Sequence, residues 1–139
     1  MKSDQISIMS SSDREPSLYD QLGGDRKMSL FVDYFLDGVM SDSELACYHA
    51  KFQDSYEMEL LKFKLVQFFK FKLDGQAHYI GKDMYEVHKT LGITDKLFDK
   101  ACVVFTQQLR RLKPKMPVFR EFIKRISDLR PCIVIPLPK

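Results

Sequence analysis

The chain contains no tryptophan, only three histidines and three cysteines, and no apolar run of the roughly 20 residues that a membrane-spanning helix needs. Its cysteines, Cys47, Cys102 and Cys132, form no CxxC pair, so they indicate free thiols in a reducing compartment rather than a disulfide framework. The 22 basic and 19 acidic residues give a net charge of +3, too little to indicate a nucleic-acid or membrane partner. Residues 1–16 lack the apolar core of a signal peptide. We therefore expect a cytoplasmic protein.

The chain does contain enough apolar material for one folded domain. Hydrophobic residues make up 45% and charged residues 29% of its 139 residues, which is typical of a globular protein. Residues 1–16 are polar, and we expect a disordered lead there. The predicted domain spans 17–131, and 132–139 form a C-terminal tail whose composition is strand-like.

Apolar periodicity predicts an all-α fold. Ser17 is placed to cap a short helix that Gly23-Gly24 end, and Asp25 is placed to cap a second helix that reaches Met40. Further helices are expected at about 45–52, at 56–73, around His88, from about 95 to 112 and at 118–129. Either Thr94 or Asp95 is expected to cap the fourth of these. Pro117 fits the first turn of the last helix, and Pro131 is expected to end it. Because short and long helices alternate, a regular four-helix bundle is not favoured.

His88 is the most informative residue in the chain. It lies in the segment MYEVHKTLGIT, where a short helical run precedes a Gly-Ile-Thr break. A neutral imidazole binds iron, and a lone histidine that faces apolar side chains is how many proteins hold haem. By itself the pattern is weak, because a solitary histidine is more often a hydrogen-bonded structural residue.

The predicted helix upstream of His88 has one apolar face, which carries Leu61, Leu65 and Phe68. Such a stripe most often faces a protein core. Lys64 is the exception, because it places a cation at the margin of this face. The ordinary interpretation is a lysine whose apolar stem lies on the protein while its ammonium group reaches water.

Several motifs occur in an order that resembles the group I truncated haemoglobins. They are SLYDQLGG at 17–24, Phe35, the pair Phe68-Phe69, LDG at 73–75, GKDM at 81–84, Val87-His88 and LGIT at 91–94. The resemblance extends from about Ser17 to Leu129. It implies a two-over-two helical sandwich around haem b, with His88 as the proximal ligand of the iron.

The same resemblance implies a set of residues that contact the haem. These are Phe35, Leu36, Leu61, Leu65, Phe68, Phe69, Tyr79, Met84 and Phe98. Family members also pack a ring on the haem from the connection that here holds Tyr48, His49 and Phe52, and the sequence does not decide which of the three takes that place.

The distal side departs from the family pattern. The family's usual tyrosine, directly after the phenylalanine matched by Phe35, is Leu36 here, and two positions that are often polar are Leu61 and Leu65. Polar groups at these places donate hydrogen bonds to iron-bound oxygen in the family. Their replacement by leucine is expected to weaken the retention of O₂.

Lys64 gains a second interpretation from the resemblance. It lies 24 residues before His88, and in some relatives a histidine or lysine at the matching place coordinates the iron. An amine ligates iron only in its neutral form, which apolar surroundings and the iron itself both favour. We hypothesise six-coordinate haem with His88 and Lys64 as axial ligands. In the alternative, Lys64 pairs with a haem propionate or extends into solvent.

The implied function is the binding of O₂, NO or CO. The resemblance suggests NO dioxygenation, in which NO and O₂ give nitrate and a partner reductase restores ferrous iron. A haem-based gas or redox sensor, or an electron carrier without turnover, is the alternative. A third possibility is a helical interaction domain that holds no haem.

Overall fold

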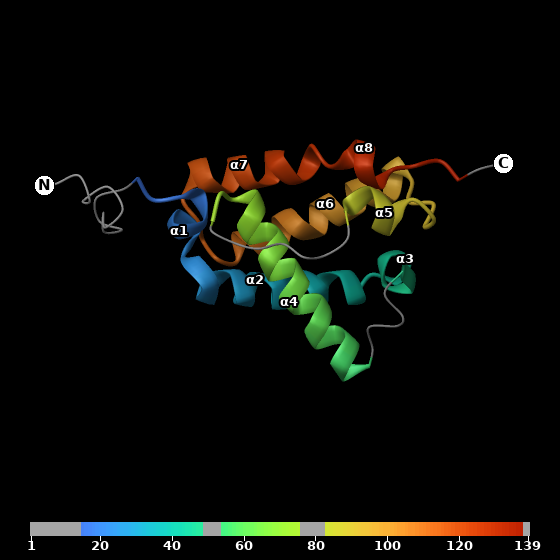
Figure 1. Ribbon diagram of the computed structural model, residues 1–139, viewed down its shortest axis with the longest axis horizontal. Coiled ribbons are helices and arrows are strands. Elements are labelled where there is room, and N and C mark those ends of the chain that lie inside the picture. Colours follow the sequence, from blue (N-terminus) through green and yellow to red (C-terminus); the bar gives the residue numbers. More distant parts are fainter. Residues whose placement is uncertain (1–14, 49–53, 76–82, 138–139) are drawn as a thin grey trace, which may run out of the picture.

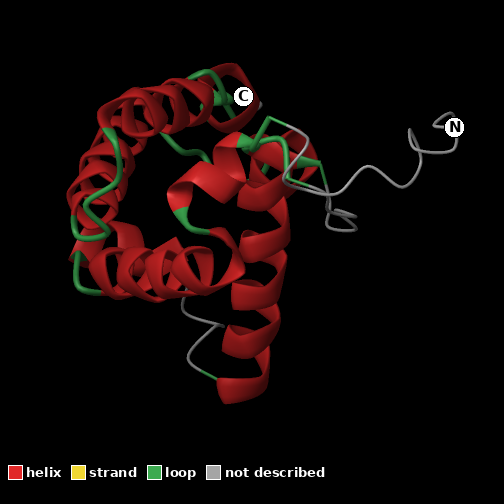
Figure 2. Cartoon of the chain, turned by 90° about the vertical axis from the view of Figure 1, so that its left-hand side faces the viewer, coloured by secondary structure: helices red, strands yellow, loops and turns green. Residues whose placement is uncertain are grey.

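The computed structural model describes residues 15–48, 54–75 and 83–137. Within these ranges every regular element is a helix and no strand occurs, which confirms the predicted all-α fold (Figure 2). The predicted N-terminal lead lies almost wholly outside the described residues. No helix in the described ranges is both long and apolar enough to cross a membrane.

The first two helices meet at the glycine pair. α1 (Leu18–Leu22) is capped as predicted, because the Ser17 hydroxyl accepts from the Asp20 amide and the Asp20 carboxylate accepts from the Ser17 amide. Gly23 has φ 131°, and a Cβ there would overlap the Lys27 side chain. α2 (Gly24–Met40) already begins at Gly24. The prediction that Asp25 is its cap is therefore wrong.

The middle of the chain contains one very short and one long helix. Asp42 caps α3 (Ser43–Ala46), which is shorter than the predicted helix at 45–52. Residues 49–53 lie outside the described part of the chain. α4 (Ser55–Lys72) is capped by Asp54 and ends within one residue of the predicted boundary.

The C-terminal half holds the remaining four described helices. They are α5 (Met84–His88), α6 (Asp95–Arg110), α7 (Met116–Ser127) and α8 (Arg130–Ile133). Pro131 lies in the first turn of α8, so it does not simply close the preceding helix as predicted. Cys132 and Ile133 are helical, and the described part of the tail, up to residue 137, contains no strand despite its strand-like composition.

The long helices form two packed pairs. α2 packs against α4 and α6, and α6 packs against α7. Figure 1 shows α4 crossing α2 steeply while α6 and α7 run side by side. Four phenylalanines meet where the helices cross, with ring centroids 4.9 Å apart for Phe31–Phe105 and Phe105–Phe122, and 5.6 Å apart for Phe69–Phe122. This cluster joins all four long helices and is expected to dominate the core energetics.

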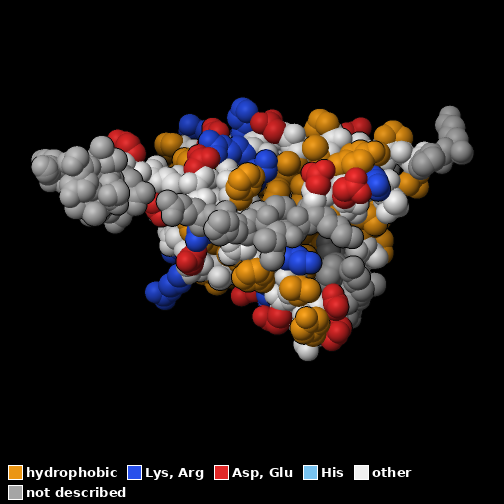
Figure 3. All heavy atoms as spheres, viewed as in Figure 1, with side chains coloured by type: hydrophobic (Ala, Val, Ile, Leu, Met, Phe, Trp, Pro, Cys, Tyr) orange, Lys and Arg blue, Asp and Glu red, His pale blue; other side chains and the backbone are white. Residues whose placement is uncertain are grey.

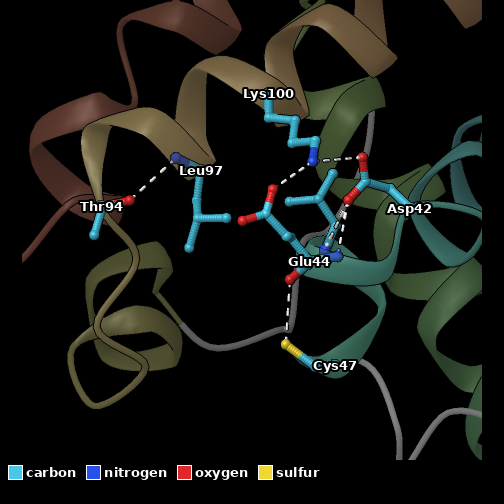
Figure 4. Close-up of polar contacts among 7 residues, drawn as sticks. Asp42, Glu44, Cys47, Thr94, Leu97 and Lys100 are labelled. Atoms are coloured by element: carbon cyan, nitrogen blue, oxygen red, sulfur yellow. Dashed lines mark hydrogen bonds and ion pairs between the residues drawn. The ribbon is translucent and has the colours of Figure 1, made fainter.

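A polar contact fixes α3 to α6. The Lys100 ammonium lies 3.1 Å from the Asp42 carboxylate and 2.5 Å from that of Glu44 (Figure 4). Near the start of the same helix, the Thr94 hydroxyl accepts a hydrogen bond from the Leu97 amide at 3.1 Å. Thr94 rather than Asp95 therefore caps α6, and the start of α6 is fixed directly after the segment that carries His88.

Candidate functional site

His88 is the last residue of α5, and its side chain is partly buried. Its Nδ1 lies 2.7 Å from the carbonyl oxygen of Met84, one helical turn earlier. Because a carbonyl oxygen only accepts hydrogen bonds, this distance assigns the proton to Nδ1 of the neutral ring. The lone pair then lies on Nε2. This is the tautomer that a histidine needs when it ligates a metal through Nε2 and is oriented by the main chain.

The chain turns sharply after His88. The Leu91 amide donates to the His88 carbonyl at 3.0 Å, and Gly92 takes up a left-handed conformation with φ 68°. A side chain there would be strained, and a Cβ would approach the Leu137 side chain to 2.9 Å. Glycine therefore suits this turn for two reasons, and α6 begins three residues later.

Most of the predicted haem-contacting residues come together in one apolar cluster. α2 contributes Phe35 and Leu36, α4 contributes four residues, and α5 contributes Met84. In this cluster Leu36, Phe68 and Phe69 are at most 6% exposed, and the partly buried members pack against them. The seven residues are Phe35, Leu36, Leu61, Leu65, Phe68, Phe69 and Met84.

Of the predicted set, Phe69 lies deeper in this cluster, Phe98 has other surroundings, and one residue cannot be placed. Phe69 lies in the aromatic core, with its ring 5.8 Å from that of Phe31. Phe98 is 4% exposed, belongs to neither of the apolar clusters found among the described residues, and lies under the Arg130 guanidinium at 4.6 Å. Tyr79 is outside the described residues, as are His49 and Phe52.

Lys64 is exposed on α4. The lysines on either side of it are tied to α2, because Lys62 pairs with Asp33 at 3.0 Å and Lys70 pairs with Asp25 at 3.2 Å. Lys64 forms no such hydrogen bond or ion pair with any residue in the described ranges. Its ammonium group is therefore not committed to a neighbouring carboxylate there.

A polar junction of α1, α2 and α4 was not expected from the sequence. The Tyr19 hydroxyl donates to the Asp25 carboxylate, and the Lys70 ammonium lies 5.1 Å from the centre of the Tyr19 ring. Burial and the adjacent carboxylate raise the pKa of Tyr19. Hydrogen bonds from Tyr19 and Lys70 lower the pKa of Asp25. Asp25 and Lys70 are 45 residues apart, so no local pattern could indicate this contact.

Comparisons with known proteins give a consistent result. The model of the family described as bacterial-like globin matches residues 17–134. The chain is 27% identical over 117 residues to the group 1 truncated haemoglobin of Tetrahymena thermophila, which covers 84% of this chain and 93% of that protein. It is 36% identical over 78 residues to the group 1 truncated haemoglobin GlbN of Mycolicibacterium paratuberculosis, covering 56% of this chain and 54% of that one.

A solved structure agrees over a longer span. The Fe(III) form of the truncated haemoglobin from Tetrahymena pyriformis matches with a TM-score of 0.75 and 27% identity, covering 89% of this chain and all of that one. The fold is thus the two-over-two helical sandwich that the sequence resemblance implied. The chain belongs to the bacterial-like globin family and, within it, to the group 1 truncated haemoglobins.

Membership of this family makes the chain a haem-binding globin, and the residues present fit that cofactor. The α5 histidine has the tautomer of a metal ligand, and the facing parts of α2 and α4 supply apolar and aromatic side chains. A porphyrin is flat and mostly apolar, so side chains of this kind are suited to hold it.

Proposed function

We propose that this globin holds haem b with His88 as the proximal iron ligand and binds O₂, NO or CO on the opposite side. The hydrogen bond between Nδ1 of His88 and the Met84 carbonyl carries this proposal, because it directs the Nε2 lone pair away from the helix backbone. Haem supplies an iron that binds diatomic ligands and can change its oxidation state. The chain's own contribution is to orient one imidazole and to surround the cofactor with apolar side chains.

The distal side chains favour weak retention of O₂. Leu36 is 3% exposed, and Leu61 and Leu65 pack against the same cluster. None of these side chains has a hydrogen-bond donor, so none can stabilise the partial negative charge on a bound oxygen.

We further propose that Lys64 is the second axial ligand when no gas is bound. Its position on α4 next to Leu61 and Leu65, together with its lack of an ion-pair partner among the described residues, supports this role. Its exposed side chain must then turn toward the cluster. In that case gas affinity falls by the fraction of molecules in which Lys64 is bound.

Absorption spectra of the ferric and ferrous protein, with and without CO, test the two ligands together. We expect a low-spin ferric spectrum that becomes high-spin in Lys64→Ala and also as the pH falls, because protonation removes the amine lone pair. His88→Ala is expected to alter the Soret band strongly, and added imidazole is expected to restore it. A high-spin wild-type spectrum that Lys64→Ala leaves unchanged contradicts the role of Lys64. An unchanged Soret band in His88→Ala contradicts the role of His88.

Two activities are compatible with this site. In NO dioxygenation, NO and O₂ are converted to nitrate and an electron-donor reductase returns the iron to its ferrous state. The absence of hydrogen-bond donors on Leu36, Leu61 and Leu65 instead favours a gas or redox sensor or an electron carrier. Mixing the O₂-bound protein with NO in the presence of a reductase separates them. Sustained nitrate formation supports the enzyme, whereas fast autoxidation without turnover supports the second function.

A further inference from the structure

The C-terminal segment of the chain lies against the helix that carries His88. α8 contacts both α5 and α6, and Figure 1 shows α8 beside α5. Hydrophobic side chains cover much of this part of the surface (Figure 3). Tyr85 and Val87 on α5 are 44% and 40% exposed, and Leu137 after α8 is 51% exposed. α5 is only one turn long, so it depends on these neighbours for its position.

Arg130 joins the start of α8 to the first two turns of α6. One guanidinium nitrogen lies 2.8 Å from an Asp95 carboxylate oxygen, and another lies 2.5 Å from an Asp99 oxygen. The central carbon of the same guanidinium lies over the buried Phe98 ring, 4.6 Å from its centre. A single side chain therefore fixes α8 to α6 by two ion pairs and one ring contact.

Leu137 provides a second point of contact on the turn between α5 and α6. Its Cδ1 is so close to Gly92 that a Cβ there would lie only 2.9 Å away. Gly92 follows His88 by four residues and precedes the Thr94 cap by two. The C-terminal segment therefore touches the turn itself through Leu137 and the helix after it through Arg130.

We propose that Arg130 and Leu137 are positioning residues for His88. They fix the turn after α5 and the start of α6, and this in turn fixes the direction of the imidazole. The inference rests on the proposed role of His88 as the haem ligand. Arg130, Asp95 and Asp99 have side chains 39%, 72% and 62% exposed, so their ion pairs contribute little to global stability. The effect of removing them is therefore local.

Haem loss from the ferric protein to excess apomyoglobin tests this inference in the full-length chain. Arg130→Ala and Leu137→Ala are expected to lose haem about 3- to 10-fold faster than the wild-type protein. The effect is expected to be smaller than the roughly 10- to 100-fold loss of metal affinity that follows removal of a direct hydrogen-bond partner of a metal ligand. Arg130→Lys keeps the charge but not the planar fork, so it is expected to fall between Arg130→Ala and wild type. Lys124→Ala is the matched control, because it removes an exposed ion pair at 2.9 Å between α7 and its C-cap residue Asp128, which includes no residue of α5, α6 or the turn between them.

A second measurement separates positioning from general stability. In the Lys64→Ala background the ferrous haem is expected to be five-coordinate, and its iron–histidine stretching band can be followed by resonance Raman spectroscopy. The band is expected to shift or broaden in Arg130→Ala and Leu137→Ala, while the urea midpoint stays at the control value. If both variants behave like Lys124→Ala, or if the midpoint falls while the band stays unchanged, the positioning role is wrong. If His88→Ala leaves the Soret band unchanged, it is the proposed function that fails.

Discussion

Leu36 and His88 offer different chemistry: one has an apolar side chain, and the other has a nitrogen lone pair. His88 offers a lone pair whose direction the Met84 carbonyl fixes at 2.7 Å. Leu36, on α2, is 3% exposed and offers only an apolar surface. In the proposed function, His88 holds the iron, and Leu36 has no donor with which to form a hydrogen bond to a bound gas.

Leu36→Tyr tests whether the missing hydroxyl limits the retention of O₂. A tyrosine hydroxyl at this position is expected to donate to bound O₂ and to slow its dissociation about tenfold, the equivalent of one hydrogen bond of about 1.4 kcal/mol. Stopped-flow replacement of O₂ by CO measures the rate. Leu36→Phe is the control, because it adds the same ring without the hydroxyl. Equal rates in the two variants would show that volume, and not hydrogen bonding, governs retention.

The family resemblance and the helix that ends at His88 could be predicted from the sequence, because the motifs around His88 are local and ordered along the chain. Arg130 left none. Its partners Asp95 and Asp99 lie 35 and 31 residues earlier in the chain, so its contacts exist only after folding. The place of Phe98 beneath Arg130 escaped prediction for the same reason.

At the scale of elements, the junction of α1, α2 and α4 is the clearest case of helices fixed by a few polar groups. Tyr19 donates to Asp25, and Lys70 reaches the same carboxylate at 3.2 Å. These three residues hold the N-terminal helix against the C-terminal end of α4.

Asp25→Asn is expected to destabilise the protein by about 1 kcal/mol or less near neutral pH, since the Asp25 side chain is 75% exposed. The folded state lowers the pKa of Asp25, so its contribution is present above the unfolded value of about 3.9 and is lost as the pH falls through the lower folded value. The difference between wild type and variant is therefore expected to shrink below about pH 4. Urea unfolding at several pH values measures it. A difference that is equal at neutral and acidic pH would contradict the linkage.

Helix boundaries were predictable where a side chain caps the end of the helix. Ser17 and Thr94 cap helices through their own oxygens, and that preference is local. α8 was not predicted, because Pro131 was interpreted as the end of a helix although proline is equally suited to a first turn. Asp25 was assigned as a cap because its distant partners are invisible in the sequence.

For the whole molecule, stability is expected to depend on the phenylalanines where the helices cross. Phe122 is fully buried, and its ring lies 5.7 Å from Phe31, 5.6 Å from Phe69 and 4.9 Å from Phe105. The four rings come from α2, α4, α6 and α7. Removing one of them disturbs every long helix at once.

Phe122→Ala is expected to lower the free energy of unfolding by about 3–5 kcal/mol, because it removes apolar contacts and leaves a cavity. Urea denaturation followed by circular dichroism measures the loss. Phe63→Ala is the control. Its side chain is 53% exposed on α4, and its removal is expected to change stability by no more than about 0.5 kcal/mol. Similar losses in both variants would place the stabilising contacts elsewhere.

The acceptor that orients His88 is a main-chain oxygen, and this has a consequence for how the protein can diverge. A side-chain partner can be lost by one codon change, but every residue type carries the same carbonyl. The imidazole therefore keeps its tautomer whatever helix-compatible residue stands at position 84, and only packing against the apolar cluster restricts the side chain there. Inherited variation is expected to be tolerated among apolar residues at Met84 and to be purged wherever it breaks the single turn of α5.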